Sequence, residues 1–179
     1  MFIHVLLATA LINAKDSYGN IYRVRAFLDQ GSQASFVTER TVNLLRFKKT
    51  STNIPITGLG SSKAAVVRSK VILTLSSIYN KDFTFNVNAL TLSKITNLLP
   101  SQQFKLGDWK HLAKLELADP SYNEPTEIDI LLGAEIYGWN NQRFTRCIHC
   151  RTLHQLANDD GHKFPLAKLV LLNDLAKMQ

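Results

Sequence analysis

The chain has 179 residues, of which 45% are hydrophobic and 20% are charged, and its formal net charge is +7. This length suits one domain of ordinary size with a buried core, and the composition excludes disordered, collagen-like and disulfide-framework proteins. The basic residues are scattered along the sequence, so the net charge alone does not indicate specific nucleic-acid binding.

The beginning of the chain, Met1 to Ile12, is largely apolar. It is shorter than the roughly 20 residues that span a bilayer, and we expect no membrane segment. It also lacks the positive n-region of a signal peptide, so a buried first strand is preferred over that alternative. Cys147 and Cys150 are too few to form a disulfide framework and favour a reducing compartment, here the cytoplasm.

The first two predicted strands form a hairpin. The apolar runs Val5 to Ala14 and Ile21 to Leu28 flank the turn-forming residues 16–20. In the second run Arg23 and Arg25 fall at alternate positions, which is typical of a half-buried strand.

Further elements follow along the chain. Thr38 is a predicted N-cap for a short helix that runs through Leu45. Pro55 indicates an edge strand, because proline cannot donate to a central ladder. The remaining predicted elements are strands within 53–57, 64–75, 83–89 and 128–133, a short helix near 109–117, and an amphipathic helix over 165–178.

The segment Ala26 to Ser32 is the most informative one for chemistry. Here an apolar strand delivers the carboxylate of Asp29 into a tight turn, and Gly31 allows the backbone to approach closely. An Asp-x-Gly sequence after a strand is by itself most often only a turn. Its meaning therefore depends on the other segments of the chain.

Three segments together resemble a known family. Phe27 to Val37 is similar to the catalytic segment of BEL/Pao retrotransposon proteases, relatives of the retropepsins, whose hallmark is an apolar pair followed by Asp-Ser/Thr-Gly. Ile54 to Gly60 lies where that family places its flap, a hairpin that closes over the substrate. Ile128 to Glu135 resembles the family's apolar-apolar-Gly segment, which passes beside the catalytic loop and precedes a short helix. The resemblance covers residues 5–139.

This resemblance implies a mainly β fold, a small retropepsin-like acid-protease β-barrel with one or two short helices in residues 1–140. Residues 141–179 would form a tail with a C-terminal helix. The implied activity is that of an aspartic endopeptidase of a retrotransposon polyprotein, which acts on polypeptides as a homodimer without cofactor or metal. The implied site residues are catalytic Asp29; the active-site loop Gln30, Gly31 and Ser32; the flap residues Thr57, Gly58, Leu59, Gly60 and Ser61; and the second-half structural segment Leu131, Leu132 and Gly133.

The sequence departs from the family pattern in two places. Gln30 replaces the Ser or Thr that, in most retropepsins, forms a hydrogen bond across the dimer and braces the two active-site loops. The stretch after Asn140 does not resemble the family's usual continuation. These departures define an alternative function: a catalytically inactive or domesticated retropepsin-like module for dimerisation or peptide binding.

Other constellations point to chemistry less directly. Cys147 and Cys150, with His154 and His162, contain the Cys-x-x-Cys half of a structural zinc site, but the histidine spacing is longer than usual. Scattered tail residues are the simpler interpretation, with zinc binding as the alternative. The sequence has no Gly-x-Ser-x-Gly elbow of a serine hydrolase. Asp129 and Glu135 are expected to be surface or capping carboxylates.

Overall fold

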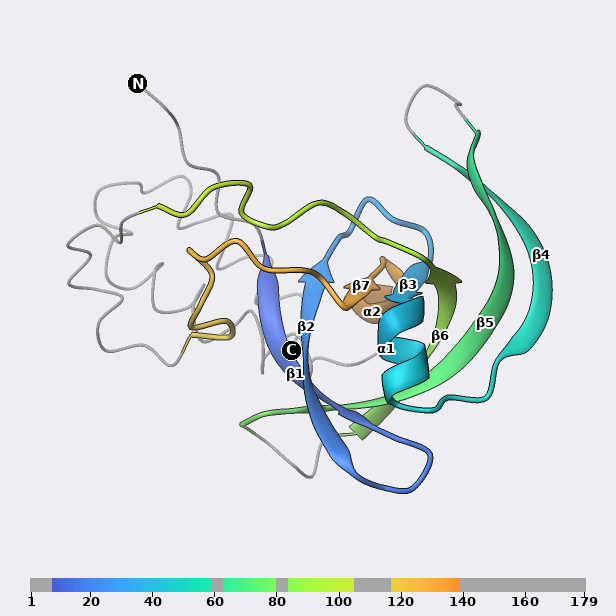
Figure 1. Ribbon diagram of the computed structural model, residues 1–179, viewed down its shortest axis with the longest axis horizontal. Coiled ribbons are helices and arrows are strands. Elements are labelled where there is room, and N and C mark those ends of the chain that lie inside the picture. Colours follow the sequence, from blue (N-terminus) through green and yellow to red (C-terminus); the bar gives the residue numbers. More distant parts are fainter. Residues whose placement is uncertain (1–7, 59–62, 80–83, 105–116, 139–179) are drawn as a thin grey trace.

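The computed structural model describes residues 8–58, 63–79, 84–104 and 117–138. Within these ranges the chain forms a seven-stranded sheet and two short helices (Figure 1). The elements in chain order are β1 (Thr9–Lys15), β2 (Ile21–Leu28), β3 (Ser35–Thr38), α1 (Glu39–Leu44), β4 (Thr50–Thr57), β5 (Lys63–Ser77), β6 (Thr84–Leu92), β7 (Ile130–Leu132) and α2 (Glu135–Gly138).

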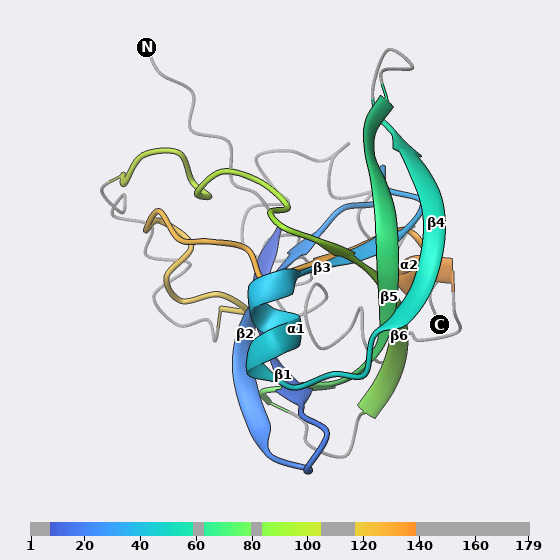
Figure 2. The same ribbon diagram turned by 45° about the vertical axis from the view of Figure 1, so that its right-hand side comes forward.

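The strands close into a barrel. Their order in the sheet is β1-β2-β7-β3-β6-β5-β4, and β1 also pairs with β5. That extra pairing closes a ring and leaves β4 outside it, at the edge of the sheet (Figures 1 and 2). For the described residues this confirms the predicted mainly β barrel with one or two short helices.

Alternate residues of several strands fill the barrel interior. Along β6 the buried residues alternate with exposed ones, and β1 shows the same alternation. This is the period-two pattern that a half-buried strand requires. Each fully buried aliphatic side chain contributes roughly 1.5–3 kcal/mol. Those buried from several strands include Ile12, Val37, Leu73, Leu75, Val87, Ile130 and Leu132.

The predicted β1–β2 hairpin turn is built around one carboxylate. Asp16 Oδ1 accepts hydrogen bonds from the amides of Tyr18 and Asn20 at 2.8 Å, and Oδ2 accepts one from Asn20 Nδ2 at 2.9 Å. Burial raises the pKa of Asp16, but these hydrogen bonds outweigh it, so the pKa lies below its ordinary value. Gly19 supplies the left-handed conformation of the turn, with φ of 93°.

Other local predictions agree with the structure. Thr38 caps α1, with its side chain accepting from the Thr41 amide at 3.2 Å, and Leu45 follows as the C-cap. Pro55 lies in the edge strand β4, opposite Val66. The strand predicted over 128–133 is shorter and covers Ile130–Leu132. Just before it, the Asp129 amide donates to the Arg25 carbonyl, and the Asp129 carbonyl accepts from the Thr38 amide.

Some predicted elements lie outside the described residues. They are residues 1–7 of the first run, Phe83, the helix near 109–117 up to residue 116, the helix over 165–178, and the four residues considered for zinc. Within the ranges that the structure describes, no helix has the length and hydropathy that a membrane crossing requires.

A buried ion pair joins β2 to the segment that precedes β7. Arg25 Nε lies 2.7 Å from Asp119 Oδ2, and the two side chains are only 5% and 1% exposed. Arg25 Nη1 donates to the Leu99 carbonyl at 2.6 Å, and the Thr9 hydroxyl donates to Asp119 Oδ2 at 2.7 Å. Both charges are therefore paired and hydrogen-bonded, as buried charges must be.

We predict that Asp119→Ala lowers the free energy of unfolding by about 3–5 kcal/mol, because it leaves the Arg25 guanidinium buried without its carboxylate. Urea denaturation followed by circular dichroism measures the change. Glu124→Ala removes an exposed carboxylate of the same segment and should change stability by less than about 0.5 kcal/mol. Equal small losses in both variants would contradict a stabilising role for the pair.

Candidate active site

Asp29 is the first residue after β2, and the backbone holds it in place. Its amide donates to the Leu132 carbonyl at 2.9 Å, which continues the pairing between β2 and β7 by one residue. Its side chain is half-buried, and Oδ1 accepts from the Gly31 amide at 2.9 Å. Among the residues that the structure describes, none donates to Oδ2. The carboxylate is thus oriented through one oxygen and open at the other.

The loop that carries Asp29 crosses the end of another strand. β7 lies between β2 and β3, parallel to β2 and antiparallel to β3. Since β2 and β3 are consecutive in the chain, the loop of residues 29–34 must pass over the end of β7 to join them. Figure 1 shows this loop above β7, at one end of the barrel.

Three hydrogen bonds fasten the loop to the chain at and beyond the end of β7. Besides the bond from the Asp29 amide, the Ala134 amide donates to the Ser32 carbonyl at 2.7 Å. The Gly133 amide donates to Ser35 Oγ at 3.0 Å, and Ser35 is fully buried. The predicted structural segment Leu131, Leu132 and Gly133 therefore lies directly against the loop that holds the candidate catalytic carboxylate.

The backbone around Gly133 leaves no room for a side chain at this position. A Cβ atom at this position would lie 2.6 Å from the Ala34 carbonyl oxygen and 2.8 Å from the Ser32 carbonyl oxygen. Both neighbours are backbone atoms that the loop geometry fixes, so only glycine allows the loop to approach this closely.

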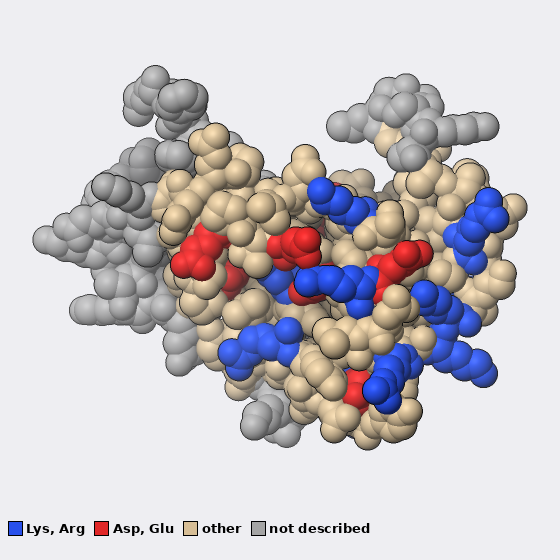
Figure 3. All heavy atoms as spheres, in the orientation of Figure 1, with Lys and Arg blue, Asp and Glu red and all other residues tan. Residues whose placement is uncertain are grey.

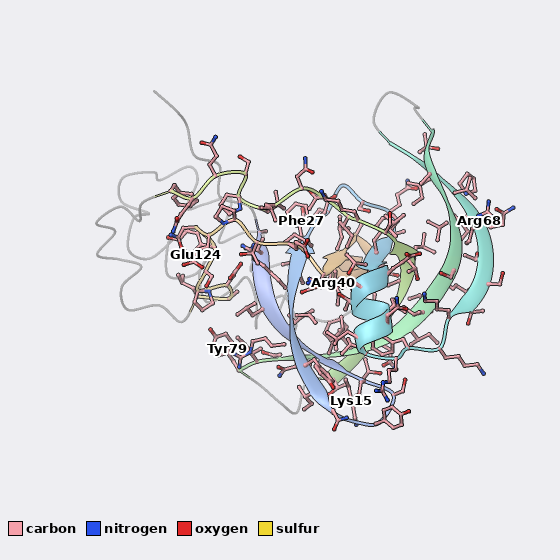
Figure 4. All side chains as sticks on the ribbon, in the orientation of Figure 1. Lys15, Phe27, Arg40, Arg68, Tyr79 and Glu124 are labelled. Atoms are coloured by element: carbon pink, nitrogen blue, oxygen red, sulfur yellow. The ribbon has the colours of Figure 1, made fainter. Side chains whose placement is uncertain are left out.

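The remaining loop residues divide into exposed and internally bonded groups. Gln30 and Gly31 are exposed at the tip of the loop. The Ser32 hydroxyl donates to the Ala34 carbonyl at 2.8 Å, so it stabilises the loop itself. Phe27 is half-buried near the end of β2, just before the loop (Figure 4).

The predicted flap belongs to the β4–β5 hairpin. Thr57 ends β4 and pairs with Lys63, with a register shift between Ile56 and Thr57. Thr57 and Gly58 are exposed, whereas Leu59, Gly60 and Ser61 lie outside the described residues. In both ribbon views the hairpin extends at the end of the barrel where the β2–β3 loop lies (Figures 1 and 2).

A second carboxylate, Asp129, joins β2 to α1. Its Oδ2 accepts from the Arg25 amide at 3.0 Å, and its Oδ1 accepts from the Thr41 hydroxyl at 3.0 Å and from Arg40 Nη2 at 2.9 Å. Arg40 also pairs with Glu127 at 3.0 Å (Figure 4). Asp129 was predicted to be a surface or capping carboxylate, but it is partly buried and joins β2 to α1, because the fold brings Arg25 and Thr41 beside it.

Comparisons with known proteins find distant structural similarities. No protein-family model matches the chain, and no curated protein matches it. Among solved structures it is similar to the EIAV protease complexed with the inhibitor HBY-793, with 17% identity and a TM-score of 0.38, over 53% of this chain and 82% of that one. It is also similar to the retroviral protease-like domain of Ddi1 from Leishmania major, with 10% identity and a TM-score of 0.35, over 75% and 78% of the two chains.

The described residues form a mainly β barrel with two short helices. At these identities and TM-scores, the two similarities establish neither a family nor an activity for this chain.

We predict that Gly133→Ala destabilises the protein by about 1–3 kcal/mol, because the new methyl group would overlap backbone carbonyls. Thermal and urea unfolding measure the loss. Gly31→Ala is the matched control: its Cβ would meet only Asp29 Oδ1, at 3.3 Å, on an exposed loop tip. A Gly133→Ala protein as stable as the Gly31→Ala protein would show that the close approach is not a constraint.

Proposed function

We propose that this chain is an aspartic endopeptidase of the retrotransposon-polyprotein type, with Asp29 as its catalytic residue. The observation that supports this most directly is the Asp29 loop. It presents a half-buried carboxylate at the end of a barrel strand, oriented by the Gly31 amide and fastened to β7. The retrotransposon type rests on the resemblance of Phe27 to Val37 to BEL/Pao proteases.

The proposed enzyme is a homodimer, because water activation by paired carboxylates needs two and the loop offers one. Gln30 and Gly31 are exposed beside Asp29, so a second copy of the loop has access to it. Two carboxylates at close range cannot both ionise cheaply, and the pair shares one proton. One carboxylate then removes a proton from water while the other donates a proton to the peptide carbonyl. The resulting pKa values belong to the pair.

The proposed substrate is an extended polypeptide. The β4–β5 hairpin stands at the same end of the barrel as the Asp29 loop (Figure 2). In the proposed mechanism the predicted flap, Thr57 to Ser61, closes over the bound chain. An extended peptide can add main-chain hydrogen bonds along the hairpin, which is a common way to bind peptides of varied sequence. No cofactor or metal takes part in this chemistry.

Gln30 favours a second candidate function, that of a non-catalytic module for dimerisation or peptide binding. Its exposed amide occupies the position where most retropepsins brace the two loops with a hydroxyl. A longer amide side chain would space the loops differently, and the separation of the carboxylates decides whether they share a proton. Peptide binding without cleavage would identify this function.

We predict that the purified chain cleaves a peptide library between about pH 4 and pH 7 with a bell-shaped pH dependence. Asp29→Asn should reduce the cleavage rate by at least about a thousandfold, since the amide cannot act as a base or share the proton. Mass spectrometry of the products measures the rates. Glu124→Gln is the control, because it makes the same change at an exposed carboxylate away from the loop.

Mixing the two proteins tests the dimer. If random pairing occurs well above the dimer dissociation constant, three equivalents of the Asp29→Asn chain leave about a quarter of the wild-type chains with a wild-type partner. Activity should fall to about that fraction, and light scattering should give the mass of a dimer. Full activity in the Asp29→Asn variant, or activity unaffected by mixing, would rule out the proposed mechanism.

A further inference from the structure

Exposed basic residues gather on one side of the barrel although they are scattered in the sequence. We call this set the basic surface, and it comprises Lys15, Arg46, Lys48, Lys49, Arg68 and Lys70. Two strand registers bring them together. Thr50, which follows Lys49, pairs with Lys70, and Lys15 pairs with Thr74 on the same side of β5 as Lys70. Figure 3 shows the resulting basic atoms along the right and lower right of the molecule.

The charge of the basic surface is not neutralised by neighbouring acids. The ion pairs formed within the described residues involve Arg25 and Arg40, and none involves a member of this set. Two acids lie in the same part of the chain. Asp16 directs both carboxylate oxygens into its own turn, and Glu39 is exposed at the opposite end of α1 from Arg46. Positive potential therefore accumulates here.

An aromatic ring lies within this positive field. Tyr18 is 72% exposed, and the Arg46 guanidinium carbon lies 5.6 Å from the centre of its ring. The backbone of Arg46 is fixed by a hydrogen bond from the Ser17 hydroxyl to its carbonyl at 2.6 Å. An exposed aromatic ring among cations offers a face on which an unpaired base can stack.

We propose that the basic surface binds single-stranded nucleic acid without sequence preference, with its cations contacting phosphates and Tyr18 stacking on a base. The proposal is independent of catalysis by Asp29. The shape of the surface favours a flexible polyanion over a lipid bilayer. The set follows the curved outer wall of the barrel from Lys15 at its lower end to Arg68 at its right-hand side, so a flexible nucleic acid can contact more of these cations at once than a flat membrane can (Figure 4).

The test uses the full chain and a fluorescently labelled, mixed-sequence single-stranded RNA of about 20 nucleotides. Fluorescence anisotropy gives the dissociation constant between roughly 50 and 200 mM salt. Each phosphate contact contributes about −0.7 to the slope of log affinity against log salt, so contacts to four or more cations predict a slope near −3.

A pair of double variants separates the basic surface from net charge. Lys49→Glu with Lys70→Glu should weaken binding at least about tenfold and make the slope shallower by about 1.4, the contribution of two phosphates. Arg23→Glu with Lys94→Glu makes the same charge change at exposed positions outside the set and should weaken binding much less. Tyr18→Ala should weaken binding about fivefold or more at an unchanged slope. Circular dichroism checks that each variant is folded.

Three results would overturn the proposal. One is the absence of salt-dependent RNA binding by the wild-type chain. Another is equal weakening by the two double variants, which would reduce the effect to net charge or to cations elsewhere in the chain. The third concerns vesicles that contain about a third phosphatidylserine. If the wild-type chain binds them strongly, and Lys49→Glu with Lys70→Glu abolishes this binding but leaves RNA binding unchanged, the surface is a membrane-binding one.

Discussion

The close packing of Gly133 against the carbonyls of Ser32 and Ala34 is the constraint on which the candidate site depends. A loop that joins two strands across a third can be held tightly only if the central strand ends without a side chain. With no side chain at Gly133, its two neighbours can bond the loop. The Ala134 amide donates to the Ser32 carbonyl, and the Leu132 carbonyl accepts from the Asp29 amide. The path of the Asp29 loop thus depends on a residue more than a hundred positions away.

The polar interior below the loop supports the same geometry. Asp129 accepts from the Arg25 amide, and the Asp129 amide donates to the Arg25 carbonyl, so the two residues clamp the start of β7 to β2. The Arg25 side chain is in turn held by Asp119. Arg25 of β2 therefore holds both the start of β7, through Asp129, and the segment around Asp119. Because Arg25 is buried, breaking either contact is costly.

The parts of the fold that depend on near neighbours were predictable from the sequence. The hairpin turn at Asp16, the capped helix after Thr38 and the edge position of Pro55 each follow from a few adjacent residues. The Asp29 turn was recognised because it resembles a family motif. Its meaning could not be deduced from a turn pattern alone.

The parts that depend on distant pairings were not predictable in this way. The insertion of β7 between β2 and β3 brings Asp129 to Arg25 and Thr41, and no local pattern in the sequence contains that relation. The same holds for Asp119, which looks like an ordinary loop residue until the fold places it beside Arg25. The basic surface likewise exists only after β4, β5 and β1 are paired.

The long strand β5 belongs to both the β4–β5 hairpin and the barrel. Its first half pairs with β4 in the hairpin, its second half pairs with β6 and β1 in the barrel, and Lys70 pairs with both Thr50 and Leu90 at the changeover. The hairpin and the barrel wall therefore share one continuous strand. Any movement of the hairpin relative to the barrel must therefore bend β5, so the position of the hairpin is coupled to the barrel wall.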